Sequence, residues 1–228
     1  MSRENSVMKT TAIMMLALIL PLTFGLTVSP SHSNAKEAPL KMVVLGDSLV
    51  AGYGLGPGDA FPEKLQIAAE NSGLQLTIEN AGVSGDTTTG GLARLDWSIS
   101  ENTDIVLVEL GANDALRGIS PAVTRKNLDA ILTRLKERNI KPLLAGMLAP
   151  PNMGVDYENE FNAIYSELAK KHDVPLYPFF LDGVAAEKSL NQADGIHPTA
   201  EGVDVIVENF LPFFKQALTQ ATQSTQSN

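Results

Sequence analysis

The sequence predicts an α/β protein built on a doubly wound, five-stranded parallel sheet with a flavodoxin-like strand order. Short apolar segments alternate with longer amphipathic segments along the 228 residues, as strands and helices do in such folds. Residues 105–110 are almost entirely apolar, which is typical of a central parallel strand buried on both faces. The apolar segments also end in glycine-rich polar stretches, which suit loops at the carboxyl ends of strands. The sequence contains no internal repeat, and no linker divides its middle part.

The individual elements follow from periodicity and from residues that start or stop helices. Alternating or continuous apolar residues predict strands at 41–45, 74–78, 105–110, 141–147 and 174–177. Apolar residues at helical spacing predict helices containing 61–69, 92–97, 123–135, 157–168 and 199–218. We expect Asp59 to cap the first helix and Pro212 to bend the last.

The two ends of the chain differ in composition from the middle. Arg3 and Lys9 precede an apolar run that is followed by Ser33-Asn34-Ala35, a sequence of the small-x-small type. We therefore expect residues 1–35 to be a signal peptide, with an uncleaved anchor as the alternative. The expected folded domain covers 36–218, and the polar residues 219–228 are expected to be a disordered tail. The protein would then be periplasmic or secreted, without stable membrane insertion after cleavage.

Composition excludes several classes of function. The formal net charge of −9 argues against nucleic acid or an anionic membrane surface as a partner, since both require a basic face. The absence of cysteine excludes disulfides, thiolate nucleophiles and cysteine-ligated zinc.

Four polar segments are expected to converge on one edge of the sheet. Gly46-Asp47-Ser48, Ser84-Gly85-Asp86 and Gly111-Ala112-Asn113-Asp114 follow the first three strands. Asp194-Gly195-Ile196-His197-Pro198 lies between the fifth strand and the last helix. Because ligands bind at the carboxyl ends of strands in open α/β sheets, this edge is the predicted site.

These segments contain the groups that acyl transfer requires. Ser48 is a candidate nucleophile, His197 a candidate base, and Asp194 lies close enough in sequence to orient His197. The backbone N–H groups of Ser48 and Gly85 and the side-chain amide of Asn113 are candidate oxyanion donors.

Plain structural roles compete with some of these assignments. Ser84 is a rival nucleophile, although a loop-stabilising hydroxyl is the more usual role for such a residue. Asp47 is expected to support its turn through bonds to the backbone. Leu116 and Met153 follow the third and fourth strands and are candidate acyl-chain contacts, with a stiff proline-containing loop as the alternative for Met153.

The motifs resemble those of a known family. Gly46-Asp47-Ser48-Leu49 is similar to the signature of the GDSL hydrolases, and Ser48, Gly85, Asn113 and His197 resemble the quartet of the wider SGNH superfamily. The likeness is greatest to the bacterial periplasmic thioesterase, arylesterase and lysophospholipase group. It implies an SGNH fold, a triad of Ser48, Asp194 and His197, and an oxyanion hole formed by Ser48, Gly85 and Asn113.

The leading hypothesis is therefore a serine esterase that hydrolyses carboxylic esters and thioesters, including aryl esters, acyl-CoA and lysophospholipids, without a cofactor or metal. One alternative is a metal-dependent phosphoesterase on the same fold, using Asp47, Asp86, Asp114, Asp194 and His197. A flavodoxin-like binding module is another. We expect a monomer acting on a small acyl substrate. The sequence selects neither the natural substrate nor its chain length, and no residue in it selects a peptide.

Overall fold

Five parallel strands form the sheet at the centre of the structure, a computed structural model that describes residues 39–226. The strands are β1 (Leu40–Gly46), β2 (Leu76–Gly82), β3 (Ile105–Glu109), β4 (Lys141–Ala145) and β5 (Leu176–Tyr177). Their order in the sheet is β2-β1-β3-β4-β5, and every neighbouring pair is parallel. The predicted fold class is confirmed.

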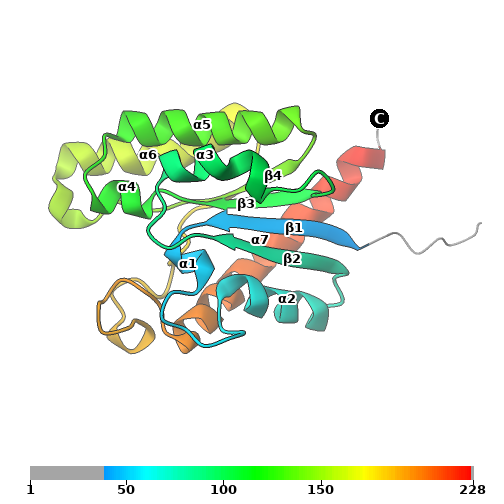
Figure 1. The fold of residues 1–228 in the computed structure, drawn as a ribbon, viewed down its shortest axis with the longest axis horizontal. Helices are drawn as coiled ribbons and strands as arrows, with labels where there is room; N and C mark the ends of the chain where they lie inside the picture. The colour runs from blue at the N-terminus through cyan, green and yellow to red at the C-terminus, as the bar shows by residue number, and fades with distance from the viewer. Residues whose placement is uncertain (1–38, 227–228) are drawn as a thin grey trace, which may run out of the picture. The chain divides into compact units, whose positions relative to one another are not determined.

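Helices cover both faces of this sheet. The helices are α1 (Ser48–Ala51), α2 (Phe61–Asn71), α3 (Thr88–Ser98), α4 (Ala112–Leu116), α5 (Pro121–Glu137), α6 (Val155–His172) and α7 (Ala200–Gln226), with 3₁₀ turns η1 (Pro151–Met153) and η2 (Lys188–Leu190). Helices α2 and α7 lie on one face, and α3, α5 and α6 lie on the other (Figure 1). This is the three-layer arrangement expected of right-handed βαβ crossovers.

The core lies where these helices pack on the two central strands. Met42–Leu45 of β1 and Val106–Val108 of β3 are at most 1% exposed. On the α2 and α7 face, Phe61 meets Phe180 and Phe210 edge to face, with ring centroids 4.9 and 5.4 Å apart. Burying a side chain of this size stabilises the fold by about 1.5–3 kcal/mol. A rigid sheet therefore supports the loops at its carboxyl end.

Strand β4 ends at Ala145 rather than at the predicted residue 147, and strands β2 and β5 differ from their predicted ranges because of backbone pairing. Strand β2 runs from Leu76 to Gly82, because Asn80, Ala81 and Gly82 continue the ladder with β1 although they resemble a loop in sequence. Strand β5 contains only Leu176 and Tyr177, because the Val174 N–H instead bonds to the Ala169 carbonyl at the end of α6. Backbone pairing with a neighbour, which side-chain pattern does not report, set the boundaries of β2 and β5.

The helix ends also differ in part. Ala60 rather than Asp59 is the N-cap of α2, and Asp59 instead lies 3.6 Å from the Lys64 ammonium. Helix α7 contains Pro212 and continues past Leu218 to Gln226, where the sequence predicted a disordered tail. Residues 227–228 and the predicted signal peptide lie outside the described residues. In the portion from 39 to 226, no helix is long and apolar enough to cross a membrane.

Candidate active site

Ser48 lies at the point where the central strand β1 ends and the short helix α1 begins. It is the first residue of α1 and is 9% exposed. Asp47 is the N-cap, and its Oδ1 accepts the Leu49 N–H at 3.0 Å. This bond is the turn-supporting role that the sequence predicted for Asp47. The turn presents the Ser48 hydroxyl at the carboxyl edge of the sheet.

His197 reaches this hydroxyl from a distant part of the chain. Its Nε2 is 2.9 Å from Ser48 Oγ, and its Nδ1 is 2.7 Å from Asp194 Oδ2. Asp194 Oδ1 accepts the backbone N–H groups of Ile196 at 2.9 Å and His197 at 3.1 Å. Three polar side chains from the predicted segments therefore form one continuous relay.

The charge on Asp194 fixes which nitrogen of His197 is protonated. The hydrogen bond from His197, followed by the two backbone bonds, lowers the pKa of Asp194 to about 2. Asp194 is thus a carboxylate at neutral pH and accepts the Nδ1 hydrogen of His197. The Nε2 lone pair then faces the Ser48 hydroxyl, the arrangement a general base requires.

The predicted oxyanion donors follow the three neighbouring strands β2, β1 and β3. Gly85 adopts a φ of +79°, which favours glycine, and its carbonyl accepts a hydrogen bond of 2.7 Å from Arg117. Asn113, in α4, donates from Nδ2 to Asp47 Oδ2 at 3.0 Å. That nitrogen carries two hydrogens, so the second remains for another acceptor. Asp47 therefore fixes the orientation of the Asn113 amide.

A second buried carboxyl lies beside Asp47, and the sequence analysis did not single it out. Glu109, the last residue of β3, is fully buried, and its Oε2 accepts the Asp47 N–H at 3.3 Å. Burial and the neighbouring Asp47 raise the pKa of Glu109 well above its usual range. Burial likewise raises the pKa of Asp47 to about 6. The only signal in the sequence was an acidic residue within an otherwise apolar strand.

The remaining acidic residues of the predicted loops have structural partners. Asp86 binds Arg94 at 2.7 Å, and Arg94 also donates to the carbonyl of Gly46 at 2.9 Å. Asp114 is fully buried and accepts the backbone N–H of Thr88 at 2.8 Å at the start of α3. Among the described residues, no group of three or more histidine or acidic side chains is placed to hold a metal ion. The metal-dependent alternative therefore lacks a ligand cluster there.

Apolar side chains are exposed in several segments that follow the carboxyl ends of the strands. Leu116 at the end of α4 is 48% exposed, and Met153 in η1 is half-buried beside the Gly118 turn. Other exposed apolar residues in segments that follow the strand ends are Tyr53, Val83, Leu148, Val155 and Ile196. Apolar side chains at this end of the sheet suit a ligand with an apolar part.

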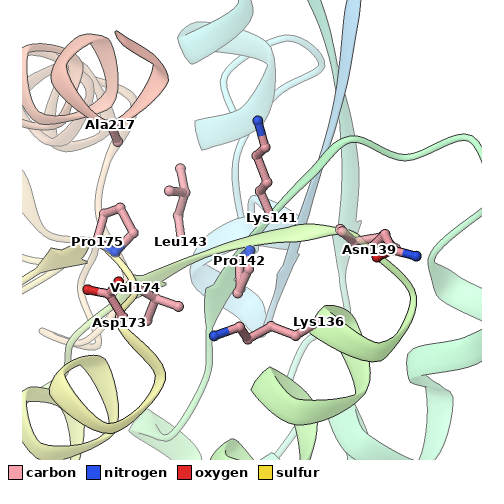
Figure 2. A pocket seen from close by; sticks show the side chains of 10 residues that line it. Lys136, Asn139, Lys141, Pro142, Leu143, Asp173, Val174, Pro175 and Ala217 are labelled. Atoms are coloured by element: carbon pink, nitrogen blue, oxygen red, sulfur yellow. The ribbon is translucent and has the colours of Figure 1, made fainter. Parts of the chain in front are cut away.

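A cavity of about 620 Å³ lies at the opposite end of the sheet (Figure 2). Lys141 and Pro142 at the start of β4 line it, together with Lys136, Val174 and Pro175. Because all strands are parallel, the start of β4 and the end of β1 lie at opposite edges. This cavity is separate from the Ser48 region.

Comparisons with known proteins agree with this geometry. Residues 44–205 match the GDSL-like Lipase/Acylhydrolase family. The chain belongs to this family. It is therefore a carboxylic ester hydrolase, and the reaction class predicted from the sequence is confirmed.

Relatives of this chain have names that describe ester and thioester hydrolysis. An arylesterase of Vibrio mimicus is 40% identical over 177 residues, covering 77% of this chain and 88% of the relative. The "Thioesterase 1/protease 1/lysophospholipase L1" of Escherichia coli (strain K12) is 41% identical over 168 residues, covering 73% and 79%. The crystal structure of AlinE4, an SGNH-hydrolase family esterase, is similar with a TM-score of 0.67 and 47% identity, covering 79% of this chain and 97% of that one.

Proposed function

We propose that this protein hydrolyses carboxylic esters and thioesters through a covalent acyl intermediate on Ser48. The observation that carries the proposal is the relay in which His197 lies 2.9 Å from Ser48 Oγ and 2.7 Å from Asp194. Both distances are within hydrogen-bonding range, and the first is short enough for proton transfer from Ser48 to His197. We assign Ser48 as nucleophile, His197 as general base and Asp194 as the group that orients His197.

In the acylation step, Ser48 Oγ attacks the carbonyl carbon while His197 Nε2 takes its proton. The carbonyl oxygen becomes an oxyanion that accepts hydrogen bonds from the N–H groups of Ser48 and Gly85 and from the Asn113 amide. The tetrahedral intermediate then collapses and breaks the bond to the leaving group, and His197 gives the proton to the departing oxygen of an ester or sulfur of a thioester. The ionised Asp194 stabilises the imidazolium while it carries the proton.

In the deacylation step, water replaces Ser48 as the nucleophile. His197 takes a proton from the water, whose oxygen attacks the acyl carbon, and a second oxyanion forms at the same donors. Collapse breaks the ester bond to Ser48, and the proton returns to Oγ. No step requires a redox partner or a metal.

Apolar side chains on segments that follow the strand ends support an acyl substrate with a hydrophobic chain. Leu116 and Met153 are the proposed acyl contacts, because one is half exposed after β3 and the other is half-buried after β4. The names of the relatives support aryl esters, acyl thioesters and lysophospholipids as substrate types. We propose hydrolysis of these small-molecule substrates without choosing among them.

We also propose that the chain is exported and acts in the periplasm or outside the cell as a monomer. The basic residues, apolar run and Ser33-Asn34-Ala35 of the first 35 residues support cleavage after Ala35. A mature protein released from its signal peptide would not stay inserted in a membrane. Mass spectrometry of the exported protein, together with light scattering for its oligomeric state, tests both points.

Replacing the nucleophile tests the catalytic assignment. Ser48→Ala should abolish hydrolysis of p-nitrophenyl butyrate and labelling by a fluorophosphonate probe. Ser84→Ala is the matched control, because Ser84 is an exposed hydroxyl on the neighbouring loop and should leave both unchanged. Undiminished turnover by Ser48→Ala would refute the proposal. A series of p-nitrophenyl esters from about two to about sixteen carbons, with an acyl-CoA and a lysophospholipid, would then define the substrate, since each methylene in an apolar site adds discrimination.

A further inference from the structure

His197 lies in a small closed loop between η2 and α7. The Gln192 N–H donates to the His197 carbonyl at 2.7 Å, and the Gly195 N–H donates to the Gln192 carbonyl at 2.9 Å. An isolated antiparallel bridge joins Asn191 to Pro198. These bonds hold the loop to itself, but they do not hold it against the turn that carries Ser48.

The side chain of Gln192 connects the His197 loop to the turn that carries Ser48. Its Nε2 donates to the Tyr53 carbonyl at 2.8 Å and to the Pro198 carbonyl at 2.9 Å. The Tyr53 N–H in turn donates to the Ser48 carbonyl at 3.1 Å. One carboxamide therefore links the backbone after Ser48 to the backbone after His197, two segments about 140 residues apart in sequence.

The adjacent backbone is shaped for this carboxamide. Gly54 has a φ of +75°, and a Cβ built on it would lie 2.2 Å from Gln192 Oε1. A side chain at position 54 would therefore displace the Gln192 carboxamide as well as strain the backbone. The Gln192 carboxamide therefore packs against the backbone of Gly54, where no side chain intervenes.

The Tyr53 side chain contacts the histidine directly. Its ring centroid is 4.5 Å from that of His197, with the planes tilted by 38°. An aromatic ring this close limits rotation of the imidazole and stabilises it when it becomes positively charged. The other groups that face His197 are Asp194 on its own loop and Ser48 and Asp47 at the end of β1.

We propose that Gln192 and Tyr53 form a clasp that positions His197 for proton transfer with Ser48. Gln192 holds the His197 loop against the Ser48 turn through its two carbonyl partners. Tyr53 supplies one of those carbonyls and packs its ring on the imidazole. Both are positioning residues that act through His197, and the inference rests on the function proposed above.

Substitutions of Gln192 test the carboxamide. Gln192→Ala should lower kcat for p-nitrophenyl acetate by about 10- to 100-fold with little change in KM, because a small displacement of the base costs rates of that order. Gln192→Glu keeps the shape of the side chain but replaces the donating NH₂ group with an oxygen that faces the two carbonyl oxygens. Both hydrogen bonds are then lost, so kcat should fall at least as far. The matched control is Gln66→Ala, which removes a similar bond of 3.0 Å to the Leu76 carbonyl far from Ser48. This control should lower the melting temperature and leave kcat unchanged.

Substitutions of Tyr53 test the ring. Tyr53→Phe keeps the ring and should retain wild-type kcat. Tyr53→Leu should lower kcat by about two- to fivefold and move the acid limb of the pH–rate profile about 0.3–0.7 of a unit to lower pH, because the imidazolium loses its aromatic neighbour. A purely structural role for Tyr53 would not shift that limb.

The outcomes separate this inference from the proposed function. If wild-type protein is labelled by the fluorophosphonate and Ser48→Ala is inactive, the proposed function stands. Gln192→Ala and Gln192→Glu with kcat within twofold of wild type would then overturn the clasp alone. If Gln192→Ala does not fold, Gln192→Glu and the two Tyr53 variants decide the question. An unlabelled wild-type protein would instead refute the proposed function.

Discussion

Asp194→Asn is the substitution for which the structure gives the sharpest expectation. Asp194 Oδ1 accepts two backbone N–H groups, from Ile196 and His197, while Oδ2 accepts Nδ1 of His197. An asparagine would keep its oxygen on the two backbone donors, since turning it over would place an amide against them. Its amide nitrogen would then face Nδ1 and donate to it. The imidazole would be forced into the tautomer with hydrogen on Nε2.

That tautomer cannot accept the Ser48 proton, because Nε2 would point a hydrogen at Oγ across the 2.9 Å contact. We expect kcat to fall by about 10³–10⁴-fold with a largely unchanged fold, the order of loss produced by the same exchange in other Ser-His-Asp sites. The assay is the kcat for p-nitrophenyl butyrate at neutral pH. Proton NMR checks the cause, because the downfield Nδ1 proton of His197 should disappear.

A second Asp–His contact in the same chain provides the control. His172 Nε2 lies 2.6 Å from Asp129 Oδ1, between α6 and α5 and away from the Ser48 edge. Asp129→Asn also replaces a carboxylate that contacts a histidine ring nitrogen, here Nε2 of His172, and should leave kcat unchanged. An Asp194→Asn protein that keeps kcat within about tenfold of wild type would refute the tautomer argument. Equal losses in both variants would point to a general effect on folding.

Three further predictions follow from the groups around Ser48. Asn113→Ala should lower kcat by about 10²–10³-fold with KM nearly unchanged, because it removes one oxyanion donor, and steady-state kinetics on a short ester measures this. Glu109→Gln should flatten the pH dependence of stability. Burial raises the pKa of Glu109 in the folded state above its usual 4.5, so its stabilising contribution is complete below that value and is lost as pH rises through the folded pKa. Urea unfolding of both proteins between about pH 5 and pH 9 should show a smaller decline for the variant. Arg94→Met should cost about 3–5 kcal/mol of unfolding free energy, because its carboxylate partner is only 11% exposed and would lose its cation. Arg125→Met, which removes an exposed ion pair, should cost less than about 1 kcal/mol, and equal losses would contradict the burial argument.

Local sequence pattern predicted the parts of this fold that depend on continuous burial. Strands β1 and β3 are apolar along their length because both faces are covered, and their predicted positions agree with the structure. Helices α5 and α6 each present one apolar stripe, and both lie where that stripe predicted a helix. Strand β2 was placed less well because it is an edge strand, whose outer residues need no apolar side chains to stay paired.

Some residues of the site could likewise be predicted from the sequence, and others could not. Ser48, Asp194 and His197 could be selected because the chemistry of acyl transfer restricts the residue types, and parallel topology brings their loops to one edge. The contact of Gln192 with Tyr53 could not be selected. It depends on a carboxamide meeting a backbone carbonyl 139 positions away, and neither residue type signals such a bond. Glu109 was passed over because its isolated charge is meaningful only beside Asp47, which the register of β3 against β1 places there.

The buried carboxyl groups of Asp47 and Glu109, at the carboxyl end of the sheet, lower the stability of the fold but orient neighbouring groups. Burying a carboxylate is unfavourable, and burial raises the pKa of both Asp47 and Glu109, with the neighbouring Asp47 adding to the effect at Glu109. Asp47 is nevertheless the only described partner that links the Leu49 N–H at the Ser48 turn to the Asn113 amide in the next loop. An apolar residue there would not bury a charge, but it would remove the acceptor of the Asn113 amide and leave the first turn of α1 uncapped. The orientation of a donor towards a developing negative charge, rather than the stability of the fold, therefore accounts for a carboxylate at this position.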